Sequence, residues 1–177
     1  MPYLVVCPVT QIQVVAAKHA PSHMLTVMSE AAEIPRPASV SSDQHKTLIF
    51  NDISTQRDGL VVPGAEHVRA ILDFADNWDR NAPLLIHCYA GVSRSTASAY
   101  IIANAMAESP DPEDLAKDLR LRSPTATPNA KMVALADSIL GKKGAMTDAI
   151  SSIGRGAYCY EGAPFVFPLK KSDAHIF

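Results

Sequence analysis

Residues 82–107 read APLLIHCYAGVSRSTASAYIIANAMA, and the composition changes twice along this segment. Residues 84–87 are a short apolar run that follows a proline, which predicts a buried strand. Residues 95–107 are rich in alanine and contain neither glycine nor proline, which predicts a helix. A tight loop separates the two elements. Such a loop collects unpaired N–H groups at the positive end of the helix, where an anion can bind.

The rest of the chain continues the alternation of strands and helices. Apolar runs predict further strands, and apolar residues at helical spacing predict further helices. An acidic start and a basic end predict the helix at residues 112–122. The expected strands are residues 3–6, 23–28 and 47–50, and the expected helices are residues 9–19, 65–78, 112–122 and 128–140. This order predicts an α/β fold, a three-layer α/β/α sandwich with a mainly parallel central sheet flanked by helices. A ligand then belongs at the carboxyl ends of the strands.

The loop after residue 87 joins a cysteine to an arginine. It reads Cys88-Tyr89-Ala90-Gly91-Val92-Ser93-Arg94. Successive loop N–H groups can form a nest around an oxyanion, and such surroundings lower the pKa of a cysteine thiol. The thiolate is a nucleophile, and the planar guanidinium binds two oxygens of a phosphate at once. These residues predict a site that transfers a phosphoryl group to sulfur and then to water.

Residues 87–95 resemble the signature of the cysteine-based protein tyrosine phosphatases: His-Cys, five residues, Arg, then Ser or Thr. The continuation Ser-Arg-Ser, four residues, Tyr-Ile is most similar to the compact dual-specificity branch. The resemblance implies that Cys88 attacks phosphorus and that residues 89–93 and Arg94 hold the phosphate oxygens. It also implies that Ser95 helps the thiolate to leave and that His87 holds the loop and tunes the thiolate.

The resemblance further implies a general acid, an aspartate on a separate loop before the cysteine. Asp52 follows the apolar run 47–50 within an Asn-Asp pair, as the acid often does in the dual-specificity branch, so we choose Asp52. Its separation from Cys88 is longer than is usual in that branch. Asp58, which lies farther along the same loop, therefore stays as the alternative.

Supporting roles are expected for two further residues. Asn51 is expected to orient its loop through side-chain hydrogen bonds, and Glu66 to pair with Arg94. Cys7 ends the first expected strand, where it is either a small core residue or a partner that forms a disulfide with oxidised Cys88. No role is assigned to Cys159.

Composition limits the classes of function. The chain has 177 residues, 47% of them hydrophobic, and a formal net charge of −2, which argues against a nucleic-acid-binding protein. No apolar run approaches the ~20 residues of a membrane helix. Three cysteines do not make a disulfide scaffold, and a thiolate nucleophile needs a reducing compartment, so we expect a cytoplasmic protein. The six histidines are scattered, so we expect neither a metal nor another cofactor.

We expect one phosphatase-like catalytic domain over residues 1–150 and an irregular tail over residues 151–177, either packed on the domain or mobile. Residues past 144 already have an irregular composition, rich in glycine and proline. The loop interior lacks lysine and arginine, which argues against phosphoinositides. The expected partner is a phosphorylated protein or a small phosphomonoester, above all phosphotyrosine, with phosphoserine and phosphothreonine as further substrates. A rhodanese-like sulfurtransferase, an arsenate reductase and a non-catalytic phosphoprotein-binding module remain alternatives.

Overall fold

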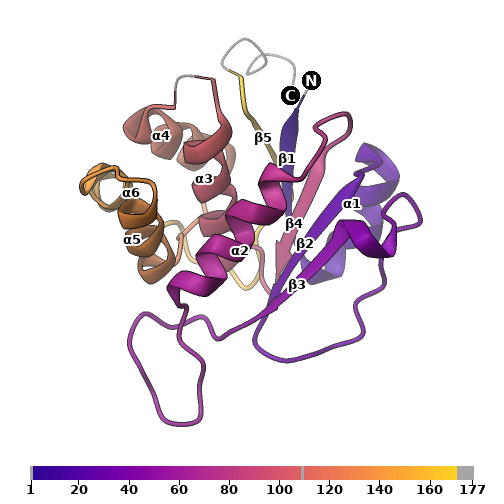
Figure 1. Cartoon of the computed structure of the whole chain (residues 1–177), viewed down its shortest axis with the longest axis horizontal. Helices are drawn as coiled ribbons and strands as arrows, with labels where there is room; N and C mark the ends of the chain where they lie inside the picture. The colour runs from indigo at the N-terminus through magenta and orange to yellow at the C-terminus, as the bar shows by residue number, and fades with distance from the viewer. Residues whose placement is uncertain (1, 109, 171–177) are drawn as a thin grey trace.

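A sheet of five strands forms the middle layer of the computed structural model, which describes residues 2–108 and 110–170. The strands are β1 (Tyr3–Pro8), β2 (His23–Met28), β3 (His45–Ile49), β4 (Leu84–Cys88) and β5 (Phe165–Pro168). Their order is β3-β2-β4-β1-β5, and every pair is parallel except β1 with β5 (Figure 1). The strand that precedes the cysteine loop, β4, therefore lies at the centre of the sheet.

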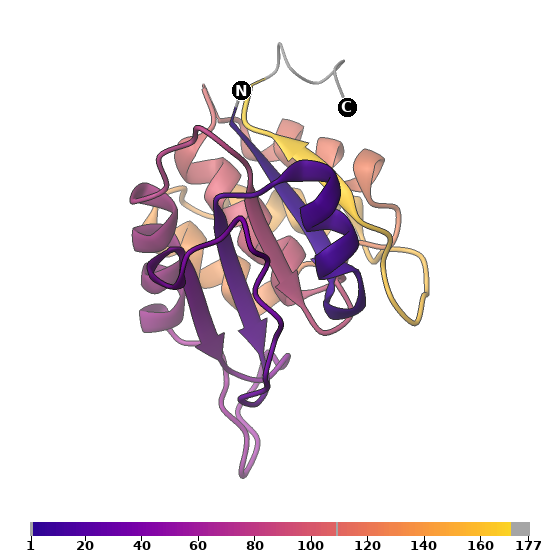
Figure 2. The ribbon, with the colours of Figure 1, turned by 90° about the vertical axis from the view of Figure 1, so that its right-hand side faces the viewer.

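Helices cover both faces of this sheet. In the described part of the chain, α1 (Ile12–His19) is the one α-helix on its face, and Figure 2 shows it in front of the strands. The opposite face carries α2 (Ala65–Asp76), α3 (Arg94–Met106), α4 (Pro112–Arg122), α5 (Ala130–Ile139) and α6 (Ala145–Ile153). Short 3-10 turns at η1 (Val9–Gln11) and η2 (Ser42–Gln44) complete these elements. The predicted three-layer sandwich with a mainly parallel sheet is confirmed.

Alternate residues of the strands fill two apolar cores, because successive side chains of a strand point to opposite faces. In β1, Leu4 and Val6 belong to the larger core beneath α2–α6, whereas Val5 and Cys7 belong to the smaller core beneath α1. Burial, with the nearby Cys88 as a second cause, raises the pKa of Cys7 to about 12. Cys7 is therefore a neutral thiol of the core at neutral pH.

The central helix α3 is buried along most of its length. Every residue from Arg94 to Asn104 is buried, and many of these residues are alanine, serine or threonine. Such small side chains let a helix approach the sheet closely and still accept neighbouring helices on its other sides. The first turn of α3, which follows the cysteine loop, is thus held by packing on all sides.

No helix within the described residues has the length and apolar character needed to cross a bilayer.

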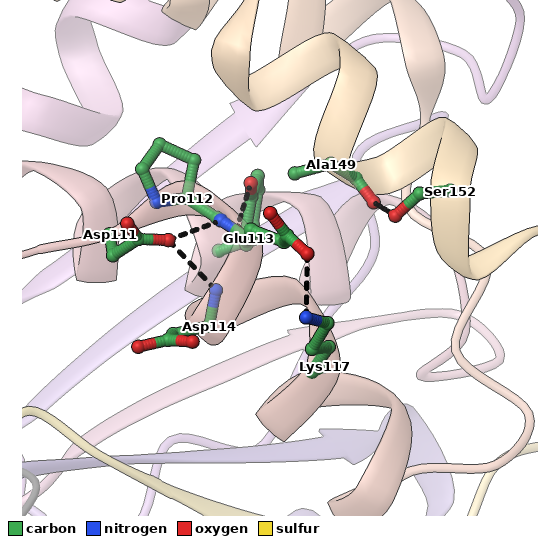
Figure 3. Close-up of polar contacts among 8 residues, drawn as sticks. Asp111, Pro112, Glu113, Asp114, Lys117, Ala149 and Ser152 are labelled. Carbon is green, nitrogen blue, oxygen red and sulfur yellow. Dashed lines mark hydrogen bonds and ion pairs between the residues drawn. The ribbon is translucent and has the colours of Figure 1, made fainter.

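Capping fixes the start of α4 beside α6. The Asp111 carboxylate accepts hydrogen bonds from the backbone N–H groups of Glu113 and Asp114, at 2.9 and 3.0 Å (Figure 3). Pro112 occupies the first turn, where its missing N–H costs nothing. Glu113 also pairs with Lys117 one turn later, at 2.6 Å. The acidic start and basic end of this segment, from which the helix was predicted, match the helix dipole.

The expectation of an irregular chain past residue 144 is wrong for two segments. Residues 145–153 form α6, and residues 165–168 form β5 at the edge of the sheet. The buried carboxylate of Asp137 starts α6 by accepting from the N–H groups of Gly144, Met146 and Thr147, at 2.6, 2.7 and 3.2 Å. Pairing with β1 makes β5 a strand despite its neighbouring prolines. A domain boundary at residue 150 would fall inside α6, and that division stays a prediction.

Candidate active site

The loop Cys88–Arg94, here called the phosphate loop, joins the end of β4 to the start of α3. Four of its carbonyl groups accept hydrogen bonds from neighbouring segments, whereas no described residue accepts a hydrogen bond from the backbone N–H groups of residues 89–93. The four donors are backbone N–H groups, and each bonds to one loop carbonyl: Val9 N to Tyr89 O (3.1 Å), Gly162 N to Ala90 O (2.8 Å), Thr127 N to Val92 O (2.9 Å) and Asn129 N to Ser93 O (3.3 Å). Consecutive free N–H groups beside a helix N-terminus are what binds an oxyanion.

Gly91 makes the turn of this loop possible. Its φ of +69° lies in the left-handed region that favours glycine. A Cβ added at this position would also lie 2.6 Å from the backbone nitrogen of Pro8, which is too close. The need for glycine at this position thus has two physical causes, the backbone angle and the contact with the end of β1.

Cys88 is 3% exposed, and its Sγ lies 3.1 Å from Ser95 Oγ in the first turn of α3. The hydroxyl can donate to a thiolate and so stabilise the negative charge on sulfur. The structure therefore brings together the predicted nucleophile and the predicted helper of its departure.

Arg94 is 5% exposed and is held from one side. Its Nη1 donates to Phe50 O at 2.7 Å and to Ser29 Oγ at 2.9 Å. Its Nε is buried, and among the described residues no acceptor contacts it. A buried N–H without a partner is costly, and an anion in the phosphate loop would supply the missing acceptor.

Of the two candidate acids, Asp52 lies against the phosphate loop. Its Oδ1 accepts from Ser93 Oγ at 2.7 Å and from Asn129 Nδ2 at 2.8 Å. Asp58 sits in the exposed turn of the long loop between β3 and α2, which extends away from the body of the molecule in Figure 1. Asn51 closes the base of that loop as expected, because its Oδ1 accepts from Val61 N at 2.8 Å.

Glu66 does not take the expected role. Its side chain is 74% exposed and lies 3.5 Å from Nδ1 of His67, whereas the partners of Arg94 are Ser29 and Phe50. The carboxylate folds back over Gly64 at the start of α2, where the helix dipole favours a negative charge. The pairing of Glu66 with Arg94 is therefore wrong.

His87 belongs to a chain of buried polar groups behind the phosphate loop. Its Nε2 lies 2.7 Å from Thr26 Oγ1 and its Nδ1 lies 3.4 Å from Cys88 O, while Thr26 Oγ1 lies 2.8 Å from His45 Nε2. A carbonyl only accepts, so Nδ1 carries the proton and Nε2 accepts from the Thr26 hydroxyl. Burial lowers the pKa of His87 to about 4, so its ring is neutral at neutral pH. His87 thus holds the Cys88 carbonyl as a neutral donor.

Sequence reasoning missed three residues of this site: Ser29, Thr26 and Asn129. Asn129 caps α5 by accepting from Met132 N at 3.1 Å, and its amide also donates to Asp52. A Pro-Asn pair before a helix signals such a cap, but nothing local signals the contact with Asp52. Ser29 and Thr26 give no local signal at all, because each meets its partner only through the order of the strands.

Comparison with known proteins gives matches among solved structures. No protein-family model matches the sequence, and no curated protein sequence matches it. The PTP-2 phosphatase of Cydia pomonella matches with a TM-score of 0.58 and 18% identity, over 75% of this chain and 83% of its own. OH1 from the Orf virus, described as a tyrosine phosphatase with triple substrate specificity, matches with a TM-score of 0.36 and 15% identity, over 79% of this chain and 72% of its own.

The chain has the fold of a protein tyrosine phosphatase. That conclusion rests on the match with PTP-2, which spans most of both chains. A shared fold does not by itself establish a reaction, so the chemistry is argued below from the phosphate loop and its neighbours.

Proposed function

We propose that this protein hydrolyses phosphate monoesters through a cysteinyl-phosphate intermediate, as a protein tyrosine phosphatase does. The observation that carries the proposal is the unoccupied set of donors around Cys88. The N–H groups of residues 89–93 and the buried Nε–H of Arg94 have no acceptor among the described residues. These donors suit the oxygens of a phosphoryl group that sits above the Cys88 sulfur.

In the first step, Cys88 Sγ attacks phosphorus in line with the ester oxygen. The S–P bond forms as the P–O bond to the alcohol or phenol breaks. Loop N–H groups and Arg94 hold the non-bridging oxygens and stabilise their charge. Asp52 gives its proton to the departing oxygen, which leaves as a neutral hydroxyl.

In the second step, water attacks the phosphorus of the cysteinyl phosphate. Asp52, now a carboxylate, takes a proton from that water, and the S–P bond breaks. The Ser95 hydroxyl, 3.1 Å from Sγ, donates to the departing thiolate. Inorganic phosphate is released, and both Cys88 and Asp52 return to their starting states.

The proposed substrate is phosphotyrosine in proteins, with phosphoserine and phosphothreonine as further substrates. The phosphate loop carries no lysine or arginine between Cys88 and Arg94, so nothing inside it would select a more highly charged headgroup. A thiolate enzyme works in a reducing compartment, and the cytoplasm is therefore the proposed location.

Phosphate release from a panel of phosphopeptides, phosphoinositides, sugar phosphates and an aryl phosphate tests the proposal. We expect release from phosphotyrosine peptides and the aryl phosphate, and none by the Cys88→Ser variant, because a hydroxyl is a far poorer nucleophile than a thiolate. Mass spectrometry of the quenched enzyme should place the phosphoryl group on Cys88. Arg69→Ala, at an exposed position of α2 outside the site, is the control variant and should keep the activity.

Other outcomes would assign another function. Turnover by Cys88→Ser would contradict the assignment of Cys88 as the nucleophile. Thiocyanate formed from thiosulfate and cyanide, without phosphate release, would indicate a sulfurtransferase. Tight binding of phosphopeptides without turnover by the native protein would indicate a binding module.

A further inference from the structure

A cavity of about 520 Å³ adjoins the phosphate loop on the side of Asp52. Val92 and Ser93 of the loop line it, together with Asp52 and Asn129. The same cavity is lined by Arg57, from the long loop after β3, and by Arg155, which follows α6. A substrate whose phosphate lies in the phosphate loop therefore has open space beside it, and two guanidinium groups border that space.

The wall that carries Arg155 is a C-terminal segment, residues 154–162, fixed to the site by backbone hydrogen bonds. Gly162 N donates to Ala90 O of the phosphate loop at 2.8 Å. Gly156 N donates to Thr127 Oγ1 at 3.1 Å, and Ala157 N donates to Pro124 O at 2.9 Å. The segment is therefore part of the site, although it lies far from the phosphate loop in the sequence.

The contact between this wall and the phosphate loop is close. A Cβ added at Gly162 would lie 3.1 Å from Gly91 O, which is tighter than an ordinary contact. Glu161, next to it, accepts a hydrogen bond from Thr10 Oγ1 at 2.9 Å. The Glu161 carboxylate is thus directed to η1. Arg155 is the one charged residue of the segment 154–162 that lines the cavity.

The charges around the cavity are unbalanced. Within residues 2–108 and 110–170, no carboxylate lies at ion-pair distance from Arg57 or Arg155. The single acidic residue of the lining is Asp52, and its Oδ1 already accepts from Ser93 and Asn129. The chain as a whole has a formal charge of −2, so this pair of cations is a local feature.

We propose that this cavity is a second anion subsite, in which Arg57 and Arg155 bind an acidic group that lies close to the phosphorylated residue of a peptide substrate. The acidic group is a carboxylate side chain or a second phosphate, since a guanidinium binds either through paired N–H···O bonds. The inference rests on the phosphatase function proposed above and specifies the substrate class of the same site.

Exposed aromatic side chains favour a peptide as the ligand. Tyr158 and Tyr160 of the wall are 92% and 87% exposed, and Tyr89 of the phosphate loop is 58% exposed. Exposed tyrosines offer flat apolar faces and a hydroxyl, which is the surface that peptide-binding sites commonly use. A peptide bound in the cavity would contact Tyr158, which lines it together with Arg155.

The experiment compares three phosphotyrosine peptides that differ at one neighbouring position: glutamine, glutamate or phosphoserine. The measured quantity is the ratio of kcat/KM for each acidic peptide to kcat/KM for the neutral one. We expect ratios above one, with the larger ratio for phosphoserine because it carries more charge. Arg155→Ala and Arg57→Ala should each lower the ratios by about fivefold, the upper range for an exposed ion pair. High salt should lower them too.

Arg69→Ala is the matched control. Arg69 is an exposed arginine of α2 that does not line the cavity, so its loss removes the same charge and should leave the ratios unchanged. Each ratio compares two substrates on one protein preparation, so a partly misfolded variant does not distort it.

Two results would overturn the inference. One is a set of ratios that stays the same in both Arg57→Ala and Arg155→Ala. The other is a dependence on these arginines for the turnover of a soluble phosphoinositide with neighbouring phosphates, together with turnover of the peptides that does not depend on them. Absence of turnover in the native protein would count against the proposed function alone, because the binding affinities of the Cys88→Ser protein for the same peptides give the same ratios without catalysis.

Discussion

Asp52 and Asp58 belong to one loop, yet only Asp52 touches the phosphate loop, through Ser93 at 2.7 Å. We therefore expect Asp52→Asn to lower kcat by roughly 10²- to 10⁴-fold for an alkyl phosphate, the usual contribution of a general acid. Asp58→Asn should leave kcat close to that of the native protein. The loss in Asp52→Asn should shrink for an aryl phosphate with a strongly acidic phenol, because that leaving group departs without a proton. Steady-state kinetics with a series of leaving groups measures both effects.

The leaving-group series also separates catalysis from positioning. If Asp52 only held Ser93 and Asn129 in place, its replacement would slow every substrate by the same factor. A general acid also adds a basic limb to the pH profile of kcat, and Asp52→Asn should remove that limb. A uniform loss with an unchanged pH profile would contradict the assignment of Asp52.

Single residues of the site could be predicted where their spacing is local. Cys88, Gly91 and Arg94 share one loop between a strand and a helix, so the sequence alone indicated their common site. The contacts of Arg94 with Ser29 and Phe50 come from other strands, and no local pattern encodes them. The predicted pairing of Glu66 with Arg94 was wrong for the same reason, because no local pattern shows which residues contact Arg94.

The start of α6 depends on a single carboxylate from α5. Asp137 is 5% exposed and accepts from three N–H groups around Gly144 and Met146. Asp137→Ala removes these charge-assisted bonds and leaves the donors unsatisfied, so we expect the free energy of unfolding to fall by about 2–4 kcal/mol. Urea unfolding with an unchanged m-value measures the loss.

Asp148→Ala is the control for this prediction. Asp148 also lies in the first turn of α6 but is exposed, so its removal should cost no more than about 1 kcal/mol. Equal losses in the two variants would show that the general charge at the helix start matters and that the cap by Asp137 does not.

Secondary structure could be predicted from local pattern except near the C-terminus. The apolar run of β2 and the charge pattern of α4 gave the same bounds that the structure has. By contrast, α6 needs the cap from Asp137, and β5 is a four-residue strand that exists through its pairing with β1. β3 begins earlier than expected, at His45, because the pairing with β2 extends it beyond its apolar residues.

The arrangement of the whole sheet joins distant segments around the site. Parallel strands were predictable from the alternation of strands with helices, although no α-helix lies between β2 and β3, but the order β3-β2-β4-β1-β5 was not. This order sets Thr26 of β2 beside His87 of β4 and so completes the buried chain behind Cys88. The same order makes the stability of the whole molecule depend on a buried histidine.

That dependence predicts how unfolding responds to acid. Burial lowers the pKa of His87 from 6.5 to about 4. Between these two pH values, His87 binds a proton in the unfolded chain but not in the native protein. The stability is therefore complete above about pH 6.5 and falls as the pH drops to about 4, by roughly 3 kcal/mol for this one group at 1.36 kcal/mol per unit.

The contribution of His87 must be separated from that of other histidines. Burial also lowers the pKa of His19, His23 and His45, so these groups too reduce the free energy of unfolding as the pH falls. His87→Gln keeps an acceptor for the Thr26 hydroxyl and does not titrate. Urea unfolding from neutral pH to about pH 4 should therefore give a shallower loss in His87→Gln than in the native protein, by up to about 3 kcal/mol. Parallel curves for the two proteins would show that His87 is protonated in the folded state, and the proton assignment behind Cys88 would then be wrong.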